Sequence, residues 1–154
     1  MTANAAGRAV VTAVPVLDTV AYAAGDILTN RCVAFSDIAD AQRGSFTINR
    51  FIVADAKNVG APIELWLFDS DINLGSNGSN QMFALNSNMV ASTLGILGSG
   101  PYVSAGSNKV AIASNVAMPV RLASGTTLYA VPVVRAAATY SVDSLQFNLD
   151  VTRD

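Results

Sequence analysis

Hydrophobic and polar residues alternate with a period of two along much of this 154-residue chain. The clearest case is residues 145–151, where four apolar side chains alternate strictly with polar ones, as in a half-buried strand. Residues 44–55 alternate in the same way, with a slip near Arg50 that fits a β-bulge. Residues 63–68 form a third apolar segment, bounded by Pro62. This periodicity predicts strands for most of the chain.

Weaker segments complete the strand prediction. Residues 126–135 are rich in β-branched side chains, but Pro132 cannot donate to a ladder and predicts an edge strand or a bulge. Further strands are predicted over 10–16, 27–35, 88–97, 109–113 and 116–122. About eight to ten strands separated by Gly, Pro and Asn indicate an all-β fold, an antiparallel β-sandwich. An immunoglobulin sandwich has about seven strands and often a cysteine pair, so we expect a jelly-roll-like arrangement.

The start of the chain predicts an extended N-terminal arm over residues 1–15, followed by a single β-sandwich domain over residues 16–154. The first eight residues are small and aperiodic, so we expect them to find no partner within their own fold. An apolar arm of this kind can add a strand to the open edge of a neighbouring subunit. We expect its deletion to leave a folded domain that no longer binds its target. The candidate interface residues are Ala9, Val10, Val11, Val14 and Val16.

The composition indicates a structural role. Glu64 is the only glutamate, there are two lysines and no histidine, and the apolar fraction is 51%. Charged residues make up 13% of the chain, against about 25% in ordinary soluble domains. A monomer usually keeps itself dispersed with surface charge, so we expect neighbouring subunits to cover much of this surface. Without histidine, the usual catalytic triads are excluded, and we expect no enzymatic activity.

Charge, apolar runs and cysteine content indicate which kinds of partner the chain can bind. The net charge is −2 and no basic run is present, so we expect no direct binding of nucleic acid. No apolar run approaches the roughly 18 residues that span a bilayer, and the start lacks the positive residues of a signal peptide, so no membrane partner is expected. Cys32 lies in an apolar segment and is expected to be a buried structural thiol.

The polar segment 69–81 contains the one weak metal candidate. Asp69, Asp71 and Asn73 place oxygen ligands at alternate positions, as calcium loops do. However, Leu74 stands where a calcium loop has glycine, and Asn80 stands where it has a bidentate glutamate. We therefore expect a polar turn and no bound metal or cofactor.

Aromatic residues leave one alternative from a different class. A jelly-roll carbohydrate-binding module would use Trp66, Tyr102, Tyr129 or Tyr140 as stacking platforms. For Trp66 a packing role within the predicted strand 63–68 is favoured, because large aromatic side chains dominate buried cores.

Three segments resemble a group of tailed-bacteriophage virion proteins. They are DTVAYAAGD at 18–26, IELWLFD at 63–69 and LYAV at 128–131. The group is similar to head decoration, or cement, proteins, which sit on the capsid exterior. The resemblance implies a β-sandwich body, a homotrimer and extended arms that hold the major capsid protein. A tail or neck component of the same kind of virion is the alternative.

Overall fold

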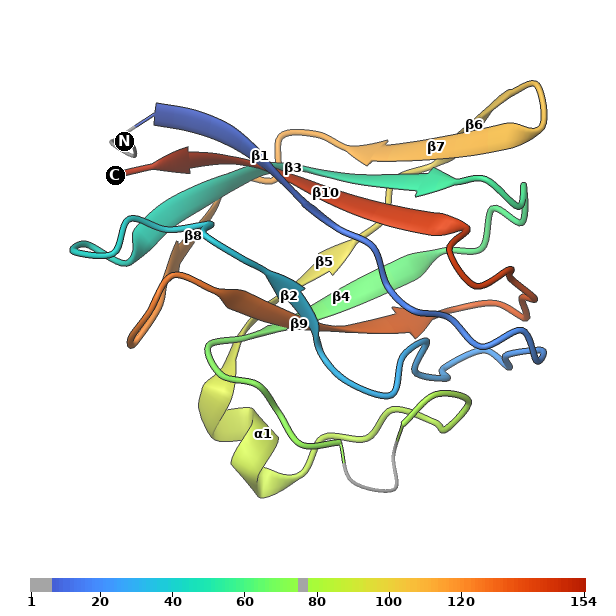
Figure 1. The fold of residues 1–154 in the computed structure, drawn as a ribbon, viewed down its shortest axis with the longest axis horizontal. Coiled ribbons are helices and arrows are strands. Elements are labelled where there is room, and N and C mark those ends of the chain that lie inside the picture. Colours follow the sequence, from blue (N-terminus) through green and yellow to red (C-terminus); the bar gives the residue numbers. More distant parts are fainter. Residues whose placement is uncertain (1–6, 75–77) are drawn as a thin grey trace.

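The structure, a computed structural model, describes residues 7–74 and 78–154, which form two antiparallel β-sheets and one short helix (Figure 1). The strands are β1 (Gly7–Ala13), β2 (Val33–Phe35), β3 (Ser45–Asp55), β4 (Ile63–Phe68), β5 (Thr93–Gly98), β6 (Tyr102–Ala105), β7 (Asn108–Ala113), β8 (Met118–Arg121), β9 (Leu128–Val134) and β10 (Leu145–Arg153). The helix is α1 (Ser87–Ser92). The all-β prediction is confirmed.

The strand order is that of a jelly roll. The large sheet runs β1-β10-β3-β7-β6, with β8 pairing the other end of β3, and the small sheet runs β2-β9-β4-β5. The pairs are nested, since β1 pairs with β10, β2 with β9, β3 with β7 and β8, and β4 with β5. A chain folded as one long antiparallel ribbon and then rolled into two sheets gives this order, so the jelly-roll expectation is also confirmed.

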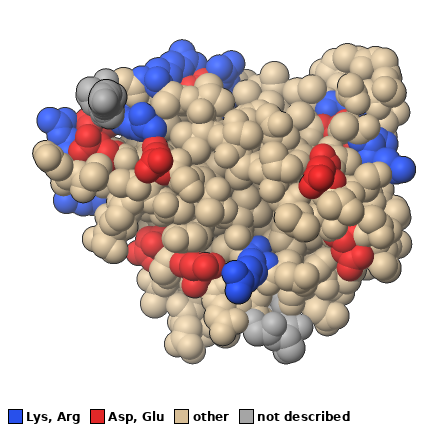
Figure 2. Space-filling view, viewed as in Figure 1, with Lys and Arg blue, Asp and Glu red and all other residues tan. Residues whose placement is uncertain are grey.

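The surface carries few charges, as the composition predicts (Figure 2). Positive side chains gather along the upper edge of this view, where Figure 1 places β1, β3 and β10. Carboxylates predominate across the lower and central part of the face turned to the viewer (Figure 2). Other positive side chains lie at the left and right edges of the same view beside carboxylates, so the charges are scarce but not fully separated (Figure 2).

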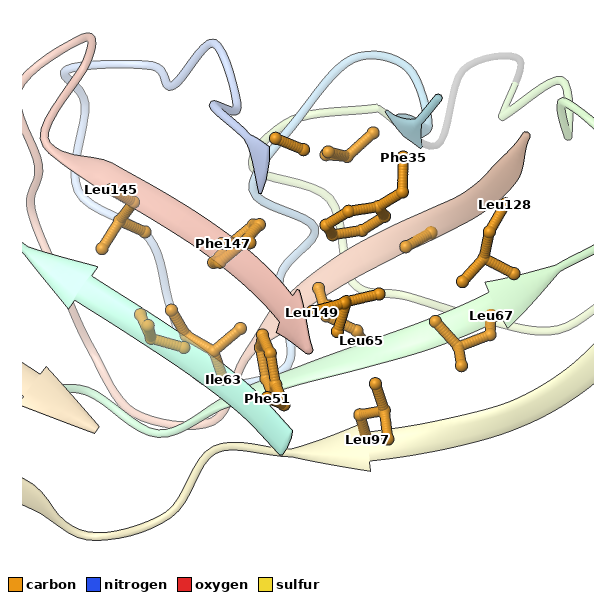
Figure 3. Packing of buried hydrophobic residues seen from close by; sticks show 14 of the residues in the cluster. Phe35, Phe51, Ile63, Leu65, Leu67, Leu97, Leu128, Leu145, Phe147 and Leu149 are labelled. Atoms are coloured by element: carbon orange, nitrogen blue, oxygen red, sulfur yellow. The ribbon is translucent and has the colours of Figure 1, made fainter. Parts of the chain in front are cut away.

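The core lies between the two sheets and is built from alternate strand residues. In β10 the apolar residues Leu145, Phe147, Leu149 and Val151 are at most 1% exposed, as their alternation predicts. Figure 3 shows Phe147 and Leu149 pointing into the space that side chains of β4 enter from the opposite sheet. The rings of Phe147 and Phe51 are 6.0 Å apart and tilted by 58°. Each such side chain contributes about 1.5–3 kcal/mol by its burial.

A β-bulge in β3 lies where the sequence slips. Asp150 pairs with Arg50 while Val151 pairs with Ile48, so Asn49 is the extra residue. The buried residues of β3 are spaced three apart across this point, from Ile48 to Phe51, and two apart elsewhere. The bulge restores the inward direction of the side chains beyond it, and the predicted slip near Arg50 is confirmed.

Two predicted strands differ from the structure. Of residues 27–35, only Val33–Phe35 forms a strand, while Ile27 makes an isolated bridge to Val133. Of residues 88–97, the first five belong to helix α1 and the rest to strand β5. The helix forms because the side chain of Asn86 accepts a hydrogen bond from the backbone N–H of Met89, 3.0 Å away, and caps its first turn.

Strand β9 is central and pairs in continuous register, whereas Pro132 predicted an edge strand or a bulge. It lies between β2 and β4, and Pro132 pairs with Leu65 of β4. The carbonyl oxygen of Pro132 accepts from the backbone N–H of Leu28 at 2.9 Å, so its nitrogen points to the same side. Strand β2 pairs with β9 only at Leu128–Ala130, so it does not extend alongside Pro132. The missing donor therefore interrupts no strand ladder.

Part of the predicted arm has a partner within its own chain, contrary to expectation. Strand β1 pairs with β10 over its whole length, from Gly7 opposite Arg153 to Ala13 opposite Phe147. Ala13 and Leu17 are buried in the core. The first six residues of the predicted arm lie outside the described residues.

Candidate interaction surface

The five predicted interface residues divide between two sides of the chain. Ala9 and Val11 point inward and pack against the core. Val10, Val14 and Val16 are exposed by 60%, 50% and 73%. Alternation along β1 causes the division, because successive side chains of a strand point to opposite faces. The exposed three remain available to a partner, and the interface itself stays a prediction.

An ionic cluster that the sequence analysis did not single out lies on the outer face of the large sheet. Asp150 of β10 sits between Arg8 of β1 and Arg50 of β3, and its side chain is 0% exposed. Arg8 donates from Nε to Oδ1 at 2.9 Å and from Nη2 to Oδ2 at 2.6 Å. Arg50 donates from Nε to Oδ2 at 2.7 Å, and its Nη2 lies 2.6 Å from the same oxygen. We call these three residues the arginine clamp.

The arginine clamp keeps its carboxylate ionised. The hydrogen bonds from Arg8 are the main cause that lowers the pKa of Asp150 to about 2, and those from Arg50 add to the effect against the opposing influence of burial. In turn, the carboxylate raises the pKa of Arg8 above its ordinary value. Two cations and one anion leave the clamp with a charge of +1 at neutral pH.

The remaining outward side chains of β3, β6 and β7 are mostly aliphatic. Ile52 pairs with Ile112, and Val110 pairs with Val103. Ile112 is 46% exposed and Val103 is 70% exposed. Figure 1 shows no described element above this face. Together with the arginine clamp, these four residues form what we call the outer face of the large sheet.

The small sheet, in contrast, has its outer face covered by the long connection between β4 and β5. Leu74 and Met89 of that connection pack against Phe68, Val131 and other residues of the small sheet in a second hydrophobic cluster. Figure 1 shows α1 and its flanking loops below this sheet. The two outer faces of the sandwich are thus different: the chain itself covers one, and no element among the described residues covers the other.

The predicted metal ligands lie in the same connection but in different surroundings. Asp69 lines a depression of about 350 Å³ together with Arg43 and Arg121. Asp71 and Asn73 are exposed. Two cations beside Asp69 oppose the binding of a metal ion at that carboxylate. The expectation that Asp69, Asp71 and Asn73 bind no metal ion stays a prediction.

Cys32 is half-buried beneath the same connection. Its thiol donates to the carbonyl oxygen of Ile72 at 3.5 Å. Burial raises the pKa of the Cys32 thiol to about 11. The thiolate is therefore scarce at neutral pH, as expected for a structural cysteine.

The candidate stacking aromatics are engaged in packing. Trp66 packs against Phe83 with ring centroids 5.0 Å apart, and its Nε1 donates to Glu64 at 3.3 Å. Tyr140 is 2% exposed, and Tyr102 donates its hydroxyl to the carbonyl oxygen of Ala61. Burial raises the pKa of Tyr102 to about 12 and also raises the pKa of Tyr140. Tyr129 is half-buried against the second cluster. These aromatic rings form no flat exposed platform.

Within residues 7–74 and 78–154, no three His, Cys, Asp or Glu side chains come close enough to hold a metal ion. Over the same residues no helix has the length and apolar character to cross a membrane.

Comparisons with known proteins add little. No family model and no curated protein matches the sequence. Among solved structures, the fold shows a weak likeness to a chain of Desmodium yellow mottle tymovirus, with 12% identity and a TM-score of 0.28. The match covers 98% of this chain and 82% of that chain. At this TM-score the likeness carries no argument about function.

The sequence contains a partial signal for the arginine clamp. Arg50 and Asp150 stand at polar positions of clearly alternating segments, which places both on an outward face. Which charges are neighbours depends on strand order and register, and Arg8 is 142 residues from Asp150. Sequence periodicity gives the face of each side chain but not its cross-strand partner.

Proposed function

We propose that this chain is a structural subunit of a virus particle that decorates and cements the capsid of a tailed bacteriophage. The observation that carries the proposal is a jelly roll whose surface is poor in charge and rich in exposed aliphatic side chains. Among the described residues, the exposed large apolar side chains are Val10, Val14, Val16, Val20, Met82, Leu85, Val90, Ile96, Val103, Ile112 and Val142. Outward-facing apolar side chains that adjoin one another, as Ile52 and Ile112 and Val110 and Val103 do on paired strands, are typical of a surface that a partner covers.

The alternatives for this fold have less support. Jelly rolls occur in viral capsid proteins, in lectins and in cupins. A sugar-binding role lacks its platform, since Trp66 packs against Phe83 and Tyr140 is buried. A catalytic metal centre needs a ligand cluster, which is absent from the described residues, and the sequence has no histidine. Fold alone does not assign function, so the argument rests on the surface.

In the proposed mechanism, the protein stabilises the capsid by binding to it at several points. Copies assemble as a homotrimer, which hides part of the aliphatic surface in a closed ring. The exposed valines of the N-terminal segment and the bare outer face of the large sheet contact the major capsid protein from outside. Because one ring binds at several points, a modest affinity per contact gives strong retention on the particle. In this role the protein binds neither nucleic acid nor a membrane and catalyses no reaction.

A tail or neck component is the second candidate, and it shares the fold and the surface. Only the position on the particle separates it from a decoration protein.

Electron microscopy of particles with and without this chain tests the proposal. We expect particles that lack it to bind the purified protein, with new density on the outside of the head. Density confined to the neck or tail would support the second candidate instead. A mass measurement in solution tests the trimer. A monomer that ignores particles and binds glycans on an array would overturn the proposal.

A further inference from the structure

We propose that the outer face of the large sheet binds an acidic protein surface, with the arginine clamp receiving a carboxylate from the partner. This inference deepens the proposed function, on which it rests for the identity of the partner, by naming the face and its chemistry. The bare face combines a cationic half, at β1, β10 and β3, with an aliphatic half at β3, β7 and β6.

The charge balance of the clamp is the first argument. One arginine would neutralise Asp150, yet two bind it, and their side chains are 65% and 41% exposed. The carboxylate is 0% exposed, so a partner meets the two guanidinium groups and not the acid. A second carboxylate, supplied by the partner, would make the cluster neutral. The site therefore favours a negative side chain although the whole chain carries a net charge of −2.

Geometry is the second argument. Asp150 engages Nε and Nη2 of both arginines, which leaves Nη1 of each without a hydrogen-bond acceptor in the described part of the chain. Each Nη1 carries two N–H donors, and the planar guanidinium group suits bidentate binding of a carboxylate. Since Asp150 already holds both side chains in place, a ligand loses less entropy in ordering them. Asp150 is thus a positioning residue.

A depression beside the arginine clamp can accommodate the carboxylate side chain of the partner. It measures about 400 Å³ and is lined by Arg8, Asn49, Arg50, Ser114, Asn115, Ala117 and Thr152. Its polar groups other than the arginines are neutral. Asn49 is held by a hydrogen bond from its Nδ2 to Oγ1 of Thr152, at 2.9 Å. The lining therefore places neutral hydrogen-bonding groups around a carboxylate without adding negative charge.

The neighbouring aliphatic half favours a protein over a nucleic acid. Ile52, Ile112, Val110 and Val103 form cross-strand pairs beside the clamp. Such side chains pack against apolar protein side chains but give no stacking platform for bases. Binding along a nucleic-acid backbone needs several phosphate contacts, whereas this clamp has a surplus of one positive charge. The partner is therefore a protein surface with apolar side chains next to an acidic one.

Two single variants and a matched control test the inference on the full chain. Arg8→Gln and Arg50→Gln each remove one cation from the clamp. Arg135→Gln is the control, because Arg135 forms a one-to-one ion pair with Glu64 on the small sheet, with the Arg135 side chain 40% exposed. The probes are a peptide of alternating glutamate and leucine, the same peptide with lysine in place of glutamate, and a single-stranded oligonucleotide. Binding is measured by fluorescence anisotropy at low salt and again at high salt.

We expect the glutamate peptide to bind, and each clamp variant to weaken this binding about tenfold. The control Arg135→Gln should change the affinity for this peptide less than about twofold. Arg50→Lys should bind the peptide more tightly than Arg50→Gln but less tightly than the wild type, since lysine keeps the positive charge but lacks the planar, bidentate donors of the guanidinium group. Circular dichroism confirms that each variant is folded. Equal weakening by Arg135→Gln would overturn the inference, and so would an oligonucleotide that binds more tightly than the peptide.

Particle binding separates this inference from the proposed function. If the wild-type chain binds particles and the doubly substituted clamp variant binds them equally well, the clamp inference is wrong and the proposed function stands. If the wild-type chain binds no particle but binds the glutamate peptide in a clamp-dependent way, the proposed function is wrong and the acidic-surface inference stands.

Discussion

Asp150 and Arg8 are 142 residues apart in sequence, yet Oδ2 of Asp150 lies 2.6 Å from Nη2 of Arg8. The contact joins side chains of β1 and β10, the first and last strands of the chain, which pair with each other at the edge of the large sheet. Because Arg50 binds the same oxygen from β3, one carboxylate ties together three adjacent strands. This clamp therefore contributes both to the stability of the sheet and to the chemistry of its outer face.

Replacing Asp150 tests the stabilising role. Asp150→Asn leaves Arg8 and Arg50 side by side without their anion, and we expect it to lower the free energy of unfolding by about 1 kcal/mol, since both arginines are partly solvated. In the wild type, the lowered pKa of Asp150 gives stability that is fully present above its unfolded value of about 3.9 and lost as pH falls toward 2. Urea denaturation between pH 2 and 7 measures both effects. A variant with the same pH dependence as the wild type over that interval would contradict this assignment.

Truncation of the N-terminal segment should have two separable effects. Deleting residues 1–15 removes β1 and uncovers the edge of β10, so we expect a loss of more than about 3 kcal/mol or aggregation, and not the folded domain that the sequence predicts. Deleting residues 1–6 keeps every paired residue of β1. We expect that shorter form to retain the thermal stability of the full chain. Differential scanning calorimetry of both deletions checks this, and a stable deletion of residues 1–15 would refute the role assigned to β1.

Two glycines close together in sequence should respond differently to alanine. At Gly100 an added Cβ would lie 2.4 Å from the backbone oxygen of Ile112, which cannot move without disturbing β7. We expect Gly100→Ala to destabilise the protein by about 1–3 kcal/mol. At Gly98 an added Cβ meets nothing within 4 Å, so Gly98→Ala is the matched control and should be neutral or slightly stabilising. Chemical denaturation of the two variants gives the comparison. Equal effects would show that the close approach at Gly100 is not maintained in solution.

The centre of the core should be sensitive to truncation. Phe147 is 0% exposed and packs on Phe51, so we expect Phe147→Ala to cost about 3–5 kcal/mol through lost burial and an unfilled cavity. Val103→Ala, at a position 70% exposed, should change the free energy of unfolding by less than about 0.5 kcal/mol. Thermal unfolding monitored by circular dichroism measures both. A loss at Val103 as large as that at Phe147 would mean that the aliphatic outer face is already covered in the isolated protein.

Cys32 should react slowly with alkylating agents in the native state. Burial raises its thiol pKa to about 11, so little thiolate is present at pH 8. We expect modification of the folded protein to be at least about tenfold slower than in denaturant, where the thiol has its ordinary pKa of about 8.5. Mass spectrometry of timed samples provides the measurement. Rapid native-state labelling would indicate an exposed, activated thiol.

Much of the fold can be predicted from the sequence because its strands are strongly periodic. The alternation over residues 145–151 gives a buried face and an outward face directly, and the slip near Arg50 marks the bulge at Asn49. The prediction is wrong where local capping or long-range pairing overrides the pattern. The side chain of Asn86 begins a helix inside a predicted strand, and Pro132 occupies a central strand at a place where the neighbouring strand has ended.

The sequence by itself determined most of the strands, which faces of the clearly alternating ones are buried, and that the surface carries little charge. Tertiary structure alone decided that β1 closes onto β10 and that Arg8, Asp150 and Arg50 meet. It also decided that, in the part of the chain that the structure describes, one outer face is covered and the other is not. The physical reason is that alternation is a local property set by the direction of each side chain. Strand order and register depend on contacts between segments far apart in the chain.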